Sequence, residues 1–583
     1  MTRKSLYNLG LLLGLLLLLV AFFWPVTLGR KTLLPLDNLF AFEPWKSYAG
    51  RFQVQVPHNE LLSDLILQNY AWKRLIVQAL QSHQVPLWNP YILSGLPFLA
   101  VGQHSALYPL SAIFYVLPLV KAYGWFTVAQ LLLAGAFMYI FCRTIGMRRI
   151  GGIVATIAFT FSGFMTVSIV HPMIIAAASW LPLLLAVIER LIRTQEPLLR
   201  DERPAPVSYL PWIALGALAL GLQFLAGHVE IAYYVLLVSG FYALCRLAVL
   251  WHQTRNTAQV GKLALGLIIL VLLGIGLAAI QVVPLFEVVT QNFRQESATY
   301  QQVVGWAYRW RRLIAFLVPD FFGNPTHHSY LDVLSRETIT TLRNVRGETI
   351  QTIYWDVKNY VEGASYVGVL PLLLALVAVL KKRSKYVGIF ASLAVLSLLF
   401  VFGTPLYALL YYLLPGVKQL HSPFRWIFPY TLSVSVLAGW GASWLASEGG
   451  RSRTRLPSLL GGLAASGGLL GLGVLGLSLL KPGPFIALGQ RAVQSLALAS
   501  EAFADGRAFY SYQFRNLAIF FVALVGAGLA LCLSTRRWRI WRVPLWQALG
   551  LLVLVAELFV IGSGFYPRAD PAILDLEPEL IHF

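Results

Sequence analysis

The chain has 583 residues, of which 58% are hydrophobic and only 12% charged, and its mean hydropathy is +0.68. Soluble globular proteins carry about 25% charged residues, so this composition excludes a water-soluble enzyme, a disordered protein and a disulfide scaffold. The apolar residues lie in long blocks, which is typical of an all-α polytopic membrane protein. The net charge of +20 is therefore interpreted as an orientation signal and an attraction to anionic lipids, with no nucleic acid as partner.

Thirteen blocks are long and apolar enough to predict transmembrane helices, which need about 20 residues each. With the N-terminus placed in the cytoplasm, every second connection between them is basic, as the positive-inside rule requires. This orientation predicts a multi-pass protein of the bacterial cytoplasmic (inner) membrane. The predicted spans lie near residues 8–28, 122–142, 150–169, 172–190, 208–226, 229–250, 263–284, 364–380, 386–403, 424–446, 457–480, 516–534 and 544–563.

Two apolar stretches need separate treatment. No small-residue cleavage site follows the first span, which favours an uncleaved anchor over a signal peptide. Prolines and glycines interrupt residues 96–120, which we predict to be an interfacial or re-entrant segment. The expected organisation is an anchor (1–28), an extracytoplasmic loop with interfacial and re-entrant helices (29–121), transmembrane helices 2–7 (122–284), a second large outer loop (285–363), helices 8–13 (364–563) and an outer tail (564–583).

Acids and histidines gather on the predicted outer side. Asp37 and Asp64 lie in the first outer loop, where residues 60–80 have the periodicity of an amphipathic interfacial helix. His104 follows in the same loop, and His228 and Glu230 form an HxE at a short outer turn. Ionisable groups near a bilayer boundary are costly and are therefore functional candidates. The outer face is where we expect chemistry or recognition.

The sequence carries a resemblance across most of its length. The first outer loop contains PLWNPYILSGLPFLAVGQHSALYP (86–109). It is followed, in order, by AGHVEIAYY (226–234), VPDFFGN (318–324), YVGVLPLLLAL (366–376) and SPFRWIFPYTLSVSVLAGWG (422–441). Together these landmarks resemble the YfhO-like family of bacterial integral-membrane proteins.

That resemblance implies membership of the GT-C class of membrane glycosyltransferases. Such enzymes transfer a sugar from a polyprenyl-phosphate donor to a cell-envelope acceptor on the outer face, and an acid in the first outer loop is the usual catalytic residue. The resemblance therefore implies a GT-C-like helix arrangement and hexosyl transfer here. Larger family members continue into an outer domain, and GFYPRADPAILDLEPELIHF (564–583) is similar to the opening of that segment.

Asp37 and Asp64 are the candidate catalytic residues. Glycosyl transfer needs a base close to the anomeric carbon, and Asp37 lies just outside the end of the first span. The alternative is that Asp37 caps the next helical turn. Asp64 is the second candidate, with a solvated face of the amphipathic helix as its alternative.

Arginines are the natural ligands for the donor phosphate, because a guanidinium matches two phosphate oxygens. The candidates are Arg294, Arg311 and Arg425, with lipid-headgroup binding or an interfacial position as the alternative. His228, Glu230 and His104 could form a polar site or hold a divalent cation. Glu230 could equally be paired with a neighbouring arginine.

Two other functions compete with the transferase. A flippase or transporter of a lipid-linked intermediate would place ionisable groups near the bilayer midplane. Here the mid-span positions are almost free of charge, with Glu557 an exception, and the polar residues collect at the outer mouth. A non-catalytic membrane subunit of an envelope assembly is the other alternative. Loss of activity in an Asp37 variant would exclude it.

Overall fold

Eight helical segments are long and apolar enough to cross a membrane in the computed structural model, which describes residues 3–199, 208–291, 298–420, 423–449 and 455–582. They are Leu119–Thr144 (α6), Arg149–Val170 (α7, Arg149–Thr160; α8, Gly163–Val167; η6, Ser168–Val170), Pro172–Thr194 (α9, Pro172–Ala178, and most of α10, Leu181–Leu199), Val229–Thr254 (α12), Thr257–Leu277 (α13), Leu456–Leu480 (α20), Gly506–Leu533 (α23) and Leu545–Gly562 (α24).

Shorter apolar helices complete the bundle. They are Leu6–Phe22 within α1 (Arg3–Phe22), α11 (Leu210–Leu225), α14 (Ala279–Thr290), α16 (Val369–Lys381) and α17 (Lys385–Val401). The all-α membrane class is thus confirmed, whereas the thirteen predicted spans are not. The span predicted at 263–284 breaks at Ala278 into α13 and α14, and the one predicted at 424–446 is α19 (Ile427–Trp444), which is buried along its whole length.

Small residues allow α19 to occupy the centre of the bundle. A Cβ added to Gly439 would lie 2.7 Å from the carbonyl oxygen of Gly151 on α7. One added to Gly441 would lie 2.0 Å from the carbonyl oxygen of Leu374 on α16. Transmembrane helices commonly approach at such small residues, because dispersion contacts replace the missing hydrophobic driving force.

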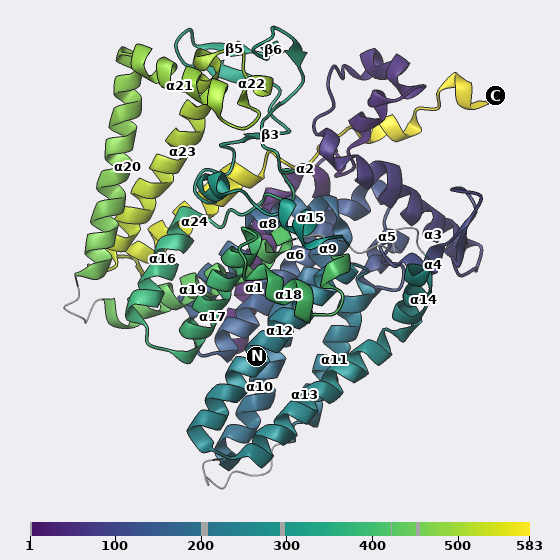
Figure 1. Cartoon of the computed structure of the whole chain (residues 1–583), viewed down its shortest axis with the longest axis vertical. Coiled ribbons are helices and arrows are strands. Elements are labelled where there is room, and N and C mark those ends of the chain that lie inside the picture. Colours follow the sequence, from purple (N-terminus) through teal and green to yellow (C-terminus); the bar gives the residue numbers. More distant parts are fainter. Residues whose placement is uncertain (1–2, 200–207, 292–297, 421–422, 450–454, 583) are drawn as a thin grey trace.

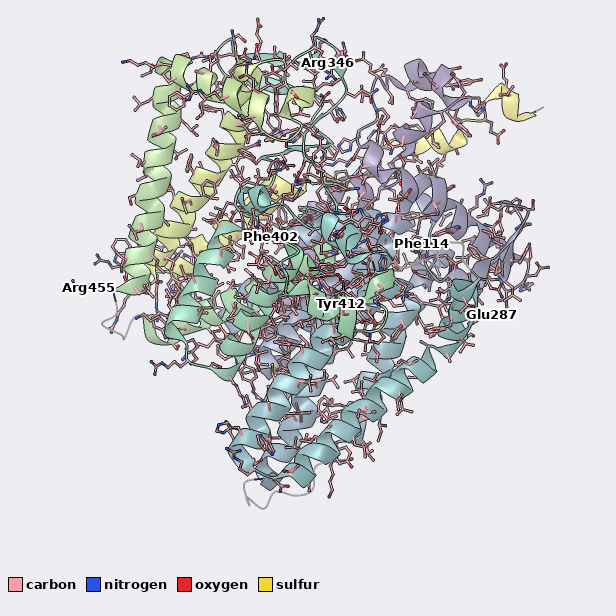
Figure 2. The ribbon with its side chains drawn as sticks, in the orientation of Figure 1. Phe114, Glu287, Arg346, Phe402, Tyr412 and Arg455 are labelled. Atoms are coloured by element: carbon pink, nitrogen blue, oxygen red, sulfur yellow. The ribbon has the colours of Figure 1, made fainter. Side chains whose placement is uncertain are left out.

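The second outer loop folds into small antiparallel two-stranded sheets that the sequence did not predict. β3 (Gly323–Asn324) pairs with β8 (Ile353–Tyr354), β4 (Tyr330–Asp332) with β5 (Glu337–Ile339), and β6 (Leu342–Arg343) with β7 (Thr349–Ile350). They enclose Trp355, which is fully buried against the end of α23 and the short α22 (Ala499–Ala502) that follows α21 (Gly483–Ser495). Figure 1 shows this cap at the top of the molecule, and Figure 2 shows Arg346 on it and Arg455 at the far end of α20.

The first outer loop consists of short elements. The C-terminal tail joins it through a bridge between Thr32 and Ala569, and the two lie side by side at the upper right of Figure 1. The segment at 96–116 contains no helix longer than five residues. The elements are α2 (Trp24–Thr27), η1 (Leu36–Ala41), η2 (Trp45–Phe52), η3 (Glu60–Leu62), the π-helical η4 (Leu65–Tyr70), α3 (Ala71–Gln81), β1 (Trp88–Asn89) paired with β2 (Leu96–Pro97), α4 (Phe98–Val101), η5 (Pro109–Ser111), α5 (Ala112–Val116), and η11 (Pro571–Asp575) and η12 (Glu579–His582) of the tail.

Short elements also connect the later helices. They are α15 (Tyr300–Gly305), η7 (Trp310–Phe316), α18 (Tyr407–Leu413), η8 (Val417–Gln419), η9 (Pro423–Trp426), η10 (Leu445–Gly449) and the hairpin of β9 (Arg539–Ile540) with β10 (Val543–Pro544). We call the end of the bundle that carries the first loop and the sheets of the second outer loop the outer end, and the opposite one the basic end.

One arginine lies inside the helix bundle. Arg246 is fully buried within α12, where it pairs with the equally buried Glu189 of α10 at 2.7 Å. Arg193, Tyr242 and Tyr386 also donate to Glu189. A charge can be retained inside a bundle when it is paired and hydrogen-bonded in this way.

Candidate functional site

An arginine and a glutamate form the centre of the candidate site at the outer end. Arg425 lies in η9, directly before α19, and Glu230 lies in the first turn of α12. The Nε of Arg425 is 3.2 Å from Oε2 of Glu230, with the side chains 14% and 16% exposed. The Oε1 of Glu230 is buried with no hydrogen-bond partner among the described residues. Oε1 of Glu230 and the terminal nitrogens of Arg425 therefore remain able to hydrogen-bond to a ligand.

Two histidines face this pair. His228 caps α12 by accepting a hydrogen bond on Nδ1 from the backbone N–H of Ile231 (3.2 Å), and His171 precedes α9. Burial, together with the nearby Arg425, lowers the pKa of His171 to about 4. Burial also lowers the pKa of His228 well below its usual value. Both imidazoles are neutral at pH 7, so they do not compete with Arg425 for an anion.

Asp64 lies within electrostatic range of the same cluster. Its exposed carboxylate raises the pKa of His171, against the larger effect of burial. The segment before it is held by Asn38, which donates to the carbonyl oxygen of Asn59 and to Oγ of Ser63, both at 3.0 Å. Asp64 is thereby connected to the turn that contains Asp37.

Asp37 lies in the first turn of η1 and is only 9% exposed. Its Oδ2 accepts a hydrogen bond from the backbone N–H of His58 at 2.5 Å, whereas Oδ1 is buried with no partner among the described residues. Burial lowers the pKa of His58, and the charge of Asp37 opposes that effect. The Nε2 of His328 lies 2.9 Å from the carbonyl oxygen of His58, so the second outer loop reaches Asp37's surroundings.

An apolar cluster ties these segments together. It brings the first loop against the turn before His171, the second outer loop and the tail. Because its members come from four separate parts of the chain, it fixes the relative position of Asp37's turn and the Arg425 cluster. Its buried members are Leu62, Val167, Val170, Val361 and Phe565.

Of the two remaining arginine candidates, Arg311 is not part of this cluster. Arg294 lies outside the described residues. Arg311 on η7 lies 3.6 Å from Asp356, which also pairs with Arg312. Burial and the neighbouring Arg309 lower the pKa of Arg311. Arg311 thus lies in a separate ion-pair cluster of the outer loop, and two of its guanidinium nitrogens are buried without a hydrogen-bond partner among the described residues.

His104 is a structural residue in this fold. It is 1% exposed, its Nε2 lies 2.9 Å from the carbonyl oxygen of Phe98, and its Nδ1 accepts from the backbone N–H of Ala106 at 3.0 Å. Burial lowers its pKa to about 4. The buried ammonium of Lys73 donates to the carbonyl oxygen of His104 at 2.6 Å. Both ring nitrogens are therefore occupied.

The sequence analysis did not select His58 or Lys358. Lys358 pairs with Glu362 at 2.7 Å, and its ammonium lies 4.1 Å from the ring centre of Phe424, next to Arg425. Burial lowers its pKa, and Glu362 opposes this. Neither residue lies in a motif, so only the fold of the loops reveals them.

A metal site was one interpretation of these residues. Within the described parts of the chain, no group of three or more His, Cys, Asp or Glu side chains is positioned to hold a metal ion. His228 uses Nδ1 as a helix cap and Glu230 faces Arg425. The geometry of the HxE is therefore that of a cap and an ion pair.

The fold and the site together define a polytopic helical membrane protein with an ionisable cluster at one end of its bundle. Residues 102–331 match the family model described as bacterial membrane protein YfhO, so this part of the chain is similar to that family. The match includes His171, His228 and Glu230, and the landmarks at 226–234 and 318–324. No curated protein and no solved structure matches the chain.

Proposed function

We propose that the protein is an integral-membrane glycosyltransferase of the GT-C type, which transfers a sugar from a polyprenyl-phosphate donor to a cell-envelope acceptor on the extracytoplasmic face. One observation carries the proposal: a buried carboxylate with a free oxygen, Asp37, and a partly exposed guanidinium, Arg425, are held at one end of the bundle. Glycosyl transfer from a phosphate needs a base and an anion-stabilising cation.

Asp37 is the proposed base. Its Oδ2 is fixed by the backbone N–H of His58, which leaves Oδ1 without a partner among the described residues. In the reaction, Oδ1 accepts the proton of the acceptor hydroxyl while the hydroxyl oxygen bonds to the anomeric carbon. The bond between that carbon and the phosphate oxygen breaks, and the phosphate leaves with the bonding electrons.

Arg425 is the proposed partner of the leaving phosphate. Only its Nε faces Glu230, at 3.2 Å, so its terminal nitrogens remain for a phosphate oxygen. His171 and His228 are neutral at pH 7 and serve as hydrogen-bonding walls. This assignment places the phosphate near headgroup depth, since Arg425 directly precedes the buried helix α19.

The test uses membranes that express the wild type, Asp37→Asn or the control Glu287→Gln. Glu287 is an exposed acid on α14, and Figure 2 shows it at the edge of the molecule. Each membrane receives radiolabelled polyprenyl-phosphate sugars, and label in the acceptor fraction is counted. We expect Asp37→Asn to lose about 10²- to 10⁴-fold of the transfer rate and the control to retain it. Equal transfer by Asp37→Asn, or none by the wild type with any sugar, overturns the proposal.

A further inference from the structure

A second feature lies at the basic end of the bundle, away from the proposed transfer site. A groove of about 870 Å³ runs between α1, α6, α7, α10 and α24. Its floor is apolar and includes Leu15, Ile157 and Leu551. Leu12 and Ile140 stand at its rim with 43% and 45% exposure, which opens the groove toward the surrounding lipid.

Glycines on α1 create much of this space. Gly10 and Gly14 both line the groove, and a Cβ built on either would meet no atom within 4 Å. By contrast, a Cβ on Gly135, on the opposite wall, would lie 2.5 Å from Leu15. The α1 wall is therefore open, and larger side chains would fit there.

The mouth of the groove is cationic. Arg143 at the end of α6, Arg149 at the start of α7 and Arg190 within α10 line it, and no acidic side chain among the described residues does. Arg149 lies 4.1 Å from the ring centre of Tyr7, and Arg190 lies 5.9 Å from that of Trp212. None of the three guanidinium groups has an ion-pair partner within the described part of the chain.

The length of the groove fits one lipid leaflet. It extends along α1 from Asn8 to Leu18, which corresponds to about 15 Å at 1.5 Å per residue. Half of a bilayer's hydrocarbon core is also about 15 Å thick. The apolar part thus has the length of an acyl chain, with the arginines at headgroup depth.

We propose that this groove is a binding site for an anionic glycerophospholipid of the leaflet at the basic end, which the positive-inside rule assigns to the cytoplasm. One acyl chain lies along Gly10 and Gly14, and the phosphate lies between Arg143, Arg149 and Arg190. Basic pockets between transmembrane helices on that side bind anionic headgroups. The proposal does not depend on the transfer reaction.

The experiment uses the full-length protein, delipidated in detergent and titrated with dioleoyl-phosphatidylglycerol, and bound lipid is counted by native mass spectrometry. The variants are Arg143→Gln/Arg149→Gln/Arg190→Gln, with Arg255→Gln/Lys262→Gln/Arg383→Gln as control. The control residues are also basic and exposed but do not line the groove. We expect roughly fivefold weaker binding for each groove arginine removed, and no loss in the control.

A second pair of variants tests the apolar part and stays informative if the triple variant does not fold. Gly14→Leu fills the groove, whereas the control Gly467→Leu adds the same side chain to the exposed face of α20, where a Cβ also meets nothing within 4 Å. We expect Gly14→Leu to abolish phosphatidylglycerol binding and Gly467→Leu to leave it unchanged. Retained binding in Gly14→Leu overturns the proposal.

Two further ligands test whether the groove recognises an anionic lipid, any phospholipid or phosphate alone. Dioleoyl-phosphatidylcholine should bind at least about tenfold more weakly, because its headgroup carries no net charge. Inorganic phosphate should not displace phosphatidylglycerol at millimolar concentration. Equal binding of phosphatidylcholine, or displacement by phosphate alone, would overturn the assignment to an anionic lipid.

Discussion

Among the described residues, two arginine–glutamate pairs join neighbouring helices, and they differ in how many hydrogen bonds the carboxylate accepts. Glu189 accepts hydrogen bonds from Arg246, Arg193 and two tyrosines between 2.5 and 3.1 Å. Glu230 receives a single contact from Arg425 at 3.2 Å and keeps a buried, unpartnered oxygen. The first pair is closed to solvent, whereas the second is partly open.

We assign a structural role to the closed Arg246–Glu189 pair and a functional role to the partly open Arg425–Glu230 pair. A buried ion pair is tolerated when further hydrogen bonds offset the loss of hydration, as they do around Glu189. An under-satisfied pair at the outer end retains donors and acceptors that a ligand can use.

The largest effect is expected from Arg246→Met. The substitution leaves Glu189 buried without its main counter-charge, which costs about 3–5 kcal/mol of unfolding free energy. Unfolding by SDS in mixed micelles, followed by tryptophan fluorescence, measures it. The control Arg425→Met should cost clearly less, because that pair is partly exposed. Equal losses for the two variants would contradict the contrast.

Acid should destabilise the first outer loop through His104. Its pKa in the fold is about 4, against 6.5 in the unfolded chain. As the pH falls below 6.5, the unfolded chain binds the proton first, so stability is lost progressively toward pH 4. The total is on the order of 3 kcal/mol.

Thermal unfolding at several pH values compares the wild type with His104→Gln. The variant lacks this titration and should show a flatter dependence between pH 6.5 and 4, and its transfer activity should be retained. Identical pH dependence in both proteins would show that His104 is not buried in the neutral form.

Arg425→Gln tests the open pair. Hydrogen bonds to a charged group contribute about 1.5–3 kcal/mol, so the apparent donor affinity should fall by roughly 10- to 150-fold. Titration of the labelled donor in the transfer assay measures this. Arg311→Gln is the matched control, since Arg311 is already engaged with Asp356. A larger loss for Arg311→Gln would assign the phosphate to the second outer loop.

Much of the helical fold could be predicted from the sequence, because long apolar blocks report burial in lipid directly. The same signal does not distinguish lipid from protein surroundings: the block predicted at 424–446 forms the helix α19, but this helix is buried within the bundle along its whole length. Counting charges along the sequence also cannot reveal that Arg246 is buried, because its partner Glu189 lies on another helix.

The candidate site was predicted only as a set of separate residues. Hydropathy and charge placed Glu230 and Arg425 on one side of the membrane, but their contact depends on the packing of α12 against η9. His58 could not be found, because its role comes from a backbone N–H that any residue could supply. Such contacts between distant loops leave no pattern in the sequence.

The smallest effect is expected from Asp64→Asn, which tests which of the two carboxylates is the base. Asp64 is exposed and acts on the site only through its charge on His171. That histidine has a pKa of about 4 and stays neutral at pH 7 with or without Asp64. The transfer rate at pH 7 should therefore change by at most about fivefold, the range of exposed charge interactions. A loss as large as that of Asp37→Asn would move the base to Asp64, and Asp37 would then be a residue that holds the His58 turn in place.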